Sequence, residues 1–276
     1  MAMSNHRENP IPGLLYKLFV YGFGTLCVIY LVAPIVIAVM MSFTSGQTLK
    51  YPPQGFSLRW YEALLDPVRS ATEHIAAWNS FKIAALAVLG ALLFAVPATI
   101  GMTRMKRRSV STIEPLLLAP LVLPSLVYGL AALIVANFIG FPPSLWLNVI
   151  GHVVVFGPLM YRAASVVAQG INPSLAEAST TMGASWFMTL RRVTLPLLMP
   201  GIMAGAFLVF IQSLDNVTVS LFLADASTTV LPLRMFAMIE ESLDVRVAAI
   251  SGILIAITLL GMLVARRVLA PRPQAS

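Results

Sequence analysis

Asp215 is the carboxylate whose position most needs explaining, because it falls inside an apolar run that extends from Leu197 to Leu223. A charged group near the centre of a membrane helix costs about 2.5–3.5 kcal/mol on insertion scales, so it must face water or the interior of a helix bundle. Gln212 lies three residues before Asp215 and four before Asn216, which places these polar side chains on one face of a continuous helix. This face predicts either a substrate path or gate, or a polar contact between helices.

His152 is alone within another apolar run, and we expect either a hydrogen-bonded interior histidine or a proton relay. His6, His74 and His152 are far apart in sequence and Cys27 is the one cysteine, so no metal site and no intrachain disulfide are expected. The chain has no GxxxxGK, HExxH or GxSxG pattern and no Cys-His pairing. We therefore expect no catalytic site, no cofactor bound by this chain and no ATP hydrolysis by it alone.

A polar stretch, Gly170–Pro200, lies between two apolar runs and carries its own helix signals. Asn172 is suited to an N-cap with Pro173 at the first helical position, and Gly183 is suited to a left-handed residue at a helix end. A second short helix is expected from Ser185 to the next pair of arginines. Two short helices joined at a glycine indicate a docking element rather than a simple connector.

The composition indicates a polytopic membrane protein, since 58% of the 276 residues are hydrophobic and only 11% are charged. An ordinary soluble domain is roughly 25% charged. Apolar runs of about 18 or more residues predict membrane-spanning helices. We expect an all-α chain forming a single transmembrane domain over residues 1–276. Its six spans are expected at about Lys17–Phe43, Ser80–Met102, Ile113–Ile139, Leu145–Val167, Leu197–Leu223 and Val247–Leu269.

The net charge of +7 is explained by topology, so a nucleic-acid partner is not expected. With six spans both termini lie on one side, and the basic residues on that side outnumber those on the other. They are Arg7, Lys17, Arg104, Lys106, Arg107, Arg108, Arg162, Arg191, Arg192, Arg266, Arg267 and Arg272, against Lys50, Arg59, Arg69, Lys82, Arg234 and Arg246. Positive residues favour the cytoplasmic face, so the termini and the polar stretch 170–200 are expected in the cytoplasm. The basic run at 104–108 is also suited to lipid contact.

The segments between the spans carry three further signals. Pro115, Pro120 and Pro124 predict a kinked or interrupted third span. The segment 44–79 contains SLRWYEALL, which predicts a short amphipathic helix at the outer face. Glu240, Glu241 and Asp244 form an acidic group that either meets a partner or is simply solvated.

The pattern in the polar stretch resembles the EAA loop of ATP-binding-cassette (ABC) importer permeases, with the type I permease fold. The residues that carry the resemblance are Glu177, Ala178, Ser179, Gly183, Leu195 and Pro196. The resemblance implies a coupling helix within about 170–197 that docks in a groove of an ATPase subunit. In this reading Glu177 faces a basic residue of the ATPase, Ala178 and Ser179 allow close approach, and Gly183 makes the turn. Ser179 departs from the family pattern, which has alanine there.

The resemblance narrows to the spermidine/putrescine-type subfamily, second permease subunit, through FSLRWYEALL, the proline-rich third span and SLDNVTVSLFL. It implies a second, similar permease as heterodimer partner, two ATPase subunits that bind ATP and magnesium, and an extracytoplasmic substrate-binding protein. The subfamily often has two consecutive acids where this chain has Asp215 and Asn216, and an acid where Ser125 follows Pro124. We expect Asp215, Asn216, Gln212 and Ser125 to line the substrate path. Fewer carboxylates make a monocation, a zwitterion or an opine-like compound comparably plausible.

The expected function is that of a permease subunit in a bacterial inner membrane, importing a polyamine or a related small amine or amino-acid-derived solute. Alternatives of the same class carry an opine, a phosphonate or iron. A stand-alone ion-coupled carrier working through Asp215 and His152 is a different class, and paired broken helices or inverted repeats would favour it. Neither is clear in the sequence. An intramembrane enzyme would need a catalytic group of residues that the chain does not offer.

Overall fold

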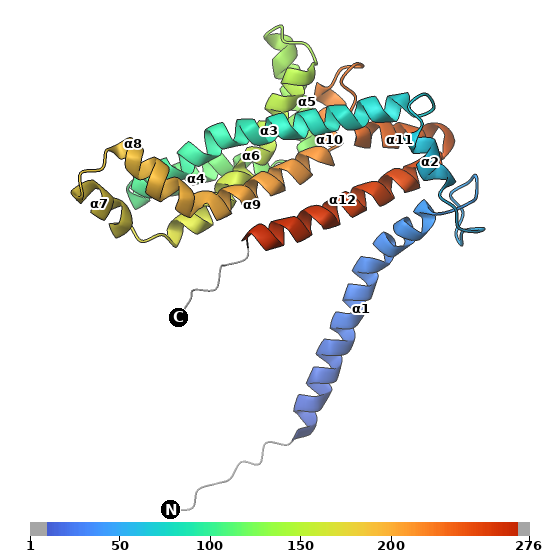
Figure 1. The fold of residues 1–276 in the computed structure, drawn as a ribbon, viewed down its shortest axis with the longest axis horizontal. Coiled ribbons are helices and arrows are strands. Elements are labelled where there is room, and N and C mark those ends of the chain that lie inside the picture. Colours follow the sequence, from blue (N-terminus) through green and yellow to red (C-terminus); the bar gives the residue numbers. More distant parts are fainter. Residues whose placement is uncertain (1–9, 270–276) are drawn as a thin grey trace, which may run out of the picture. The chain divides into compact units, whose positions relative to one another are not determined.

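The computed structural model describes residues 10–269 (Figure 1). The chain divides into two compact units. The smaller unit takes the described part of Met1–Leu64 together with Leu243–Ala256. The larger unit takes Leu65–Ser242 and the described part of Ile257–Ser276. Arg7 and Arg272 lie outside the described residues, as do the side chains of Arg266 and Arg267.

Within residues 10–269 the secondary structure is helical, and the one β-type pairing is an isolated bridge between Thr44 and Phe56. Five helices are long and apolar enough to cross a membrane, and a bent pair, α4 and α5, would be a sixth span. The expected all-α membrane fold is therefore confirmed. The helices are α1 Pro10–Ser42, α2 Arg59–Leu65, α3 Ala71–Arg104, α4 Arg107–Val122, α5 Ser125–Phe138, α6 Leu145–Gln169, α7 Ser174–Thr181, α8 Trp186–Thr189, a π-helix Leu190–Thr194, α9 Leu195–Leu214, α10 Thr218–Leu223, α11 Leu231–Ser242 and α12 Arg246–Leu269.

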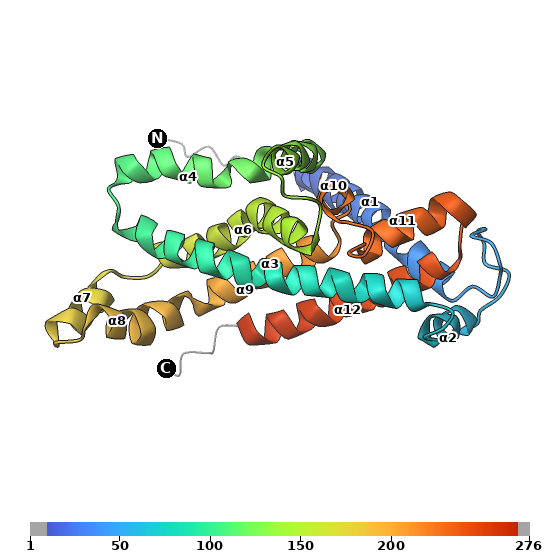
Figure 2. The ribbon, with the colours of Figure 1, turned by 90° about the horizontal axis from the view of Figure 1, so that it is seen from above.

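The larger unit is built on α3, α6 and α9, which lie side by side (Figures 1 and 2). Small residues let these helices approach closely, as is usual between membrane helices. On α3 the residues Ala84, Ala87 and Ala91 are fully buried. On α9 a Cβ atom added at Gly205 would lie 2.6 Å from the Cα of Met160 on α6, so only glycine fits there. The core of this unit thus depends on close backbone contact.

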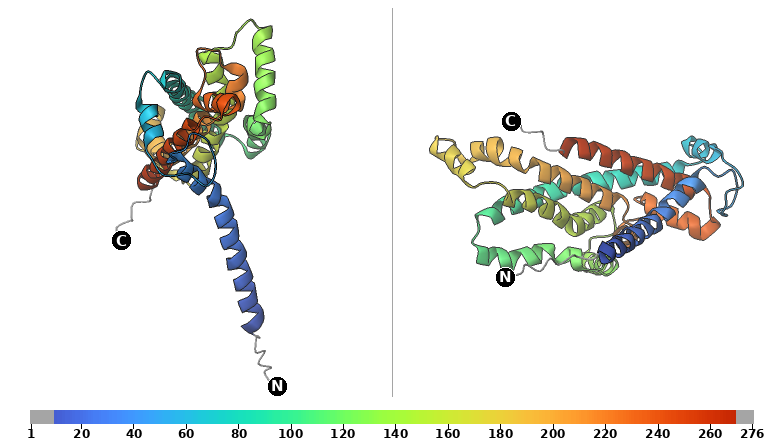
Figure 3. Two further views of the ribbon diagram at one scale, coloured as in Figure 1. Left: turned by 90° about the vertical axis from the view of Figure 1, so that its right-hand side faces the viewer. Right: turned by 90° about the horizontal axis from the view of Figure 1, so that it is seen from below.

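The third predicted span is interrupted, as the prolines indicate. Helices α4 and α5 are bent by 99° relative to one another at a short break, and the turn is visible in Figure 3. Pro124 lies at this break in an extended conformation (φ −55°, ψ 123°). It has no N–H to donate to the preceding turn, so α4 ends just before it.

The prediction of a continuous helix from Leu197 to Leu223 is wrong. Helix α9 ends at Leu214, and α10 begins at Thr218. The side chain of Asn216 accepts a hydrogen bond from the Val219 N–H at 2.8 Å, which caps the new helix. A local bond between a side chain and the backbone has here replaced continuation of α9.

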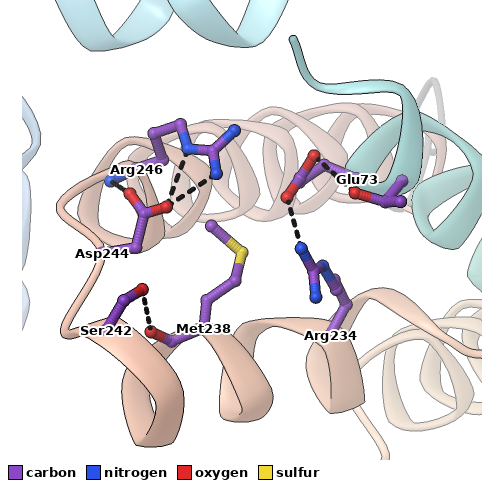
Figure 4. Close-up of polar contacts among 7 residues, drawn as sticks. Glu73, Arg234, Met238, Ser242, Asp244 and Arg246 are labelled. Atoms are coloured by element: carbon purple, nitrogen blue, oxygen red, sulfur yellow. Dashed lines mark hydrogen bonds and ion pairs between the residues drawn. The ribbon is translucent and has the colours of Figure 1, made fainter.

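Helix α11 was not predicted, since the sequence suggested no helix between the fifth and sixth spans. Three side chains of α3 hold this region. Asn79 donates to the carbonyls of Ser227 and Thr229, both at 3.1 Å, and Ser80 accepts from the Leu231 N–H at 2.8 Å. An ion pair of 3.3 Å between Arg234 and Glu73 adds a third link (Figure 4). These links explain why α3 begins at Ala71 rather than near Ser80.

The smaller unit contains the predicted short helix as α2. Its first residues fold back on the preceding loop, because Arg59 donates to the Ser45 carbonyl at 2.9 Å and Trp60 Nε1 to the Gly46 carbonyl at 3.1 Å. Asp244 pairs with Arg246 at 2.7 Å in the same unit (Figure 4). Asp244 is therefore not free to act as part of an acidic docking group.

Candidate coupling element and substrate path

Helix α7 has the two end signals that the sequence predicts. The Ser174 N–H donates to Asn172 Oδ1 at 3.1 Å, and Pro173 already has helical angles (φ −55°, ψ −30°). At the other end Gly183 takes a left-handed conformation with φ +84°. An L side chain with a Cβ rarely adopts this conformation, so glycine is required for the turn.

Two of the three residues of the EAA-like pattern on α7 face outward. Glu177 and Ala178 are exposed, whereas Ser179 is half-buried. The Ser179 hydroxyl lies 3.0 Å from the hydroxyl of Thr189 on α8, so the serine that departs from the family pattern bonds the two helices together. This bond was not foreseen, because Thr189 is ten residues away and carries no signal of its own.

Large apolar side chains are also exposed on this element. Met182 is 87% exposed, and Trp186 and Phe187 are more than half exposed. Contiguous exposed apolar side chains often mark a protein contact. Arg191 and Arg192 are exposed on the π-helix that follows.

The second short helix is not a separate element, which corrects the prediction. Helix α8, the π-helix and α9 follow one another without a break, so Trp186–Leu214 is one apolar helical stretch. Leu195 is half-buried and packs against the cluster around Ala164 and Leu198. Pro196 is exposed and is the second residue of α9, directly after the π-helix. The exposed end of this element is thus in direct helical continuity with a membrane span.

The predicted path residues lie at the α9–α10 break. Gln212 and Asp215 are exposed, and Asp215 is the residue at which α9 ends. Because the helix stops there, the predicted single helical face for Gln212, Asp215 and Asn216 is wrong. The carboxylate of Asp215 is instead exposed in the turn Asp215–Val217.

Asn216 and Ser125 are brought together through Thr218, which the sequence reading did not single out. The Thr218 hydroxyl donates to Ser125 Oγ at 2.8 Å, and Asn216 Nδ2 lies 3.4 Å from the Thr218 hydroxyl. Ser125 is the first residue of α5 and Thr218 the first of α10. The span formed by α4 and α5 and the span formed by α9 and α10 are both broken, and they are in contact where α5 and α10 begin. Asn is a favoured N-cap residue, so Asn216 could have indicated this break.

His152 is fully buried on α6 and hydrogen-bonded through both ring nitrogens. In the portion of the chain that the structure describes, no three His, Cys, Asp or Glu side chains gather where they could hold a metal ion.

Comparison with known proteins defines the class of protein to which this chain belongs. Residues 87–273 match the family described as "Binding-protein-dependent transport system inner membrane component", so the chain belongs to this family. It is an inner-membrane permease subunit of an ABC importer, which works with a substrate-binding protein and with an ATPase that carries out the hydrolysis.

Among relatives, the chain is 28% identical over 251 residues to the spermidine/putrescine permease PotC of Escherichia coli K12, covering 90% of this chain and 92% of PotC. It is 30% identical to PotC of Haemophilus influenzae, covering 83% of this chain and 88% of that protein. It is 26% identical to the putative 2-aminoethylphosphonate permease PhnV of Salmonella typhimurium, covering 89% of this chain and 91% of PhnV. The chain thus resembles ABC permeases of the polyamine type.

A chain of a solved bacterial ABC transporter that imports alginate has the same fold. Its TM-score to this protein is 0.68 at 14% sequence identity, and the match covers 95% of this chain and 99% of that one. At this identity the likeness bears on the fold alone.

Proposed function

We propose that this chain is the second permease subunit of a heteromeric importer for a polyamine or a related small amine. The observation that carries the proposal is the exposed, capped α7, which lies between two membrane helices and leads into α9 through α8. A motion at a soluble ATPase reaches the membrane only through a stiff, docked element, and this arrangement provides one.

In this proposal the segment at about 170–197 is cytoplasmic and docks in a groove of the ATPase. Glu177 pairs with a basic residue of that subunit, while Ala178 and the turn at Gly183 let the two surfaces approach. Ser179 acts within the element, and Leu195 and Pro196 connect it to α9. ATP and magnesium bind to the ATPase, so this chain itself binds no cofactor. Both termini are cytoplasmic, and residues 1–276 act as one permease domain.

The substrate path in this proposal runs past the Asp215–Val217 turn. Asp215 supplies a carboxylate for a cationic substrate, and Gln212, Asn216 and Ser125 supply neutral polar groups beside it. A single carboxylate suits one ammonium group at a time. A zwitterionic opine or aminophosphonate remains the alternative within the same class, and similarity to PhnV is the observation that favours it.

The paired breaks at Ser125 and Thr218 are a feature that a stand-alone carrier would also have. Membership of the importer family assigns them instead to an ATP-driven permease. A second, similar permease would supply the facing half of the path.

The test is substrate uptake by proteoliposomes that contain the assembled importer, with ATP inside and loaded binding protein outside. Glu177→Ala should lower uptake of spermidine at least tenfold, because a charge-assisted pair is worth roughly 1.5–3 kcal/mol. The matched control is Glu62→Ala, an exposed glutamate on α2 far along the chain from α7. Uptake that Glu177→Ala leaves unchanged would contradict the coupling role, and uptake by the chain without ATPase would favour the carrier.

A further inference from the structure

His152 connects the two sides of the α9–α10 break. Its Nδ1 lies 2.6 Å from the hydroxyl of Ser213 in the last turn of α9, and its Nε2 lies 3.1 Å from the hydroxyl of Ser220 on α10. The histidine itself is on α6, which runs unbroken from Leu145 to Gln169. One imidazole on a continuous helix thus binds both halves of an interrupted one.

The contacts form a closed network. Ser220 also exchanges hydrogen bonds with Asn148, one turn before His152 on α6, at 3.2 and 3.3 Å. A neutral ring with its proton on Nε2 satisfies every group, because Ser213 donates to Nδ1, Nε2 donates to Ser220, and Ser220 donates to Asn148 Oδ1. Phe156 packs edge-on against the ring with 5.4 Å between the centroids.

The burial of this network decides whether His152 is a hydrogen-bonded interior histidine or a proton relay. His152, Asn148 and Ser220 are fully buried, and Ser213 is only 3% exposed. A proton relay needs a chain of groups that reaches water. The partners of this ring are instead two serines that are themselves enclosed, so the network ends inside the protein.

We propose that His152 is a positioning residue that fixes the orientation of α10 relative to α9. It thereby holds the Asp215–Val217 turn and the contact between Thr218 and Ser125. Buried hydrogen bonds that are all satisfied rigidify a structure, whereas a half-satisfied set is costly, so the network has one favoured arrangement. The consequence for transport rests on the proposed substrate path, but the geometry of the break does not.

Two conservative substitutions separate the two bonds. The amide of His152→Asn reaches about as far as Nδ1 and can bond Ser213, while the amide of His152→Gln reaches about as far as Nε2 and can bond Ser220. Each variant keeps the hydrogen bond to the helix on one side of the break and loses the hydrogen bond to the helix on the other side. If both bonds are needed, neither variant restores the wild-type geometry.

The primary measurement is a distance across the break by double electron–electron resonance. Spin labels are placed with Leu208→Cys on α9 and Leu221→Cys on α10, both about half exposed, in a Cys27→Ser background. The full chain is reconstituted in lipid nanodiscs. We expect one narrow distance distribution with His152 present and a broadened or shifted one for both His152→Asn and His152→Gln.

The matched control is Thr99→Val, because the Thr99 hydroxyl is buried but bonds only the Ala95 carbonyl of its own helix, at 2.8 Å. It should leave the distribution unchanged. Should a histidine variant fail to insert, Ser213→Ala removes the bond to Nδ1, and Ser220→Ala removes the bond to Nε2 together with the bonds to Asn148, while His152 stays. Distributions identical to wild type in the inserted variants would overturn the proposal.

Transport by the assembled importer gives the second readout. Losing one buried hydrogen bond corresponds to about a three- to tenfold change in an equilibrium constant, so we expect the KM for uptake to rise by that factor. The pH profile of uptake should keep its shape in His152→Gln. A profile flattened by this substitution would show that His152 carries protons and would overturn the positioning role. If no polyamine is transported at all, the proposed function fails while the distance measurement still decides the role of His152.

Discussion

At the scale of single residues, Ser179 departs from the family pattern, which has alanine there, and its hydroxyl forms a hydrogen bond that alanine could not form. Its hydroxyl meets the nearly buried hydroxyl of Thr189 at 3.0 Å, and this bond ties α7 to α8. An alanine at position 179 would keep the close approach but lose the bond. Ser179 therefore links the two helices within the element.

A double-mutant cycle tests this bond. Ser179→Ala and Thr189→Val should each destabilise the protein by about 0.5–1.5 kcal/mol, and the double variant should cost less than the sum of the two. Thermal unfolding of the full chain in detergent measures these differences. Strictly additive effects would show that the two hydroxyls do not stabilise one another.

Asp225, in the loop after α10, gives a prediction about pH. Hydrogen bonds from the hydroxyls of Ser227 and Thr228, with further bonds from their backbone N–H groups, lower the pKa of the Asp225 carboxyl below its ordinary value of 3.8. A group with a lowered folded-state pKa stabilises the protein above its unfolded pKa and loses this contribution as pH falls through the folded value. The loop should thus be more stable at neutral pH than in acid.

Asp225→Asn should remove this dependence. We expect the wild type to melt at a higher temperature than Asp225→Asn at pH 6, and the difference should shrink as the pH is lowered toward 3. A melting difference that is constant over this range would contradict the role of the ionised carboxylate.

At the scale of elements, the close approach of α6 and α9 depends on the absence of a side chain at Gly205. A methyl group there would lie 2.6 Å from the Cα of Met160, and a backbone atom cannot move aside without shifting its helix. The spacing of the two helices is therefore set by glycine.

Gly205→Ala should destabilise the protein by about 1–3 kcal/mol through overpacking. The control is Gly101→Ala on α3, where an added Cβ meets nothing within 4 Å. Because alanine favours a helix over glycine, the control should be neutral or slightly stabilising. The two melting temperatures can be compared directly, and equal behaviour of the two variants would rule out overpacking at Gly205.

The sequence could predict those elements whose cause is local. Helix α6 matches its expected range because an apolar run begins just after Ser144, whose hydroxyl accepts from the Leu147 N–H at 3.3 Å. The ends of α7 follow from Asn172, Pro173 and Gly183 in the same way. Local chemistry near one residue is visible in the sequence.

Elements that depend on distant contacts could not be predicted. The break after Leu214 has one local signal, the capping residue Asn216, but apolar residues on both sides make the run appear continuous. Its geometry depends on Ser125 and His152, which belong to other helices. Helix α11 likewise depends on Glu73 and Asn79 of α3. Pairings across such separations leave no local pattern.

At the scale of the whole molecule, function depends on which ends of the spans face the cytoplasm. The excess of basic residues predicts that the stretch 170–200 lies there, and the ATPase can dock on α7 only if this is so. The segment between α2 and α3 must then lie on the opposite side. Topology is thus the condition on which the coupling proposal depends.

Two exposed positions of the larger unit test this topology. In a Cys27→Ser background, Val68→Cys and Met182→Cys each introduce a thiol at a site that is 86% and 87% exposed respectively. A maleimide that cannot cross membranes should label Val68→Cys from the outer face of intact spheroplasts. It should label Met182→Cys only in inverted vesicles or after permeabilisation. Expressing the chain without its partners prevents a bound ATPase from shielding position 182. The reverse pattern would place α7 outside the cell, where no ATPase could reach Glu177, and the coupling role of this element would then be wrong.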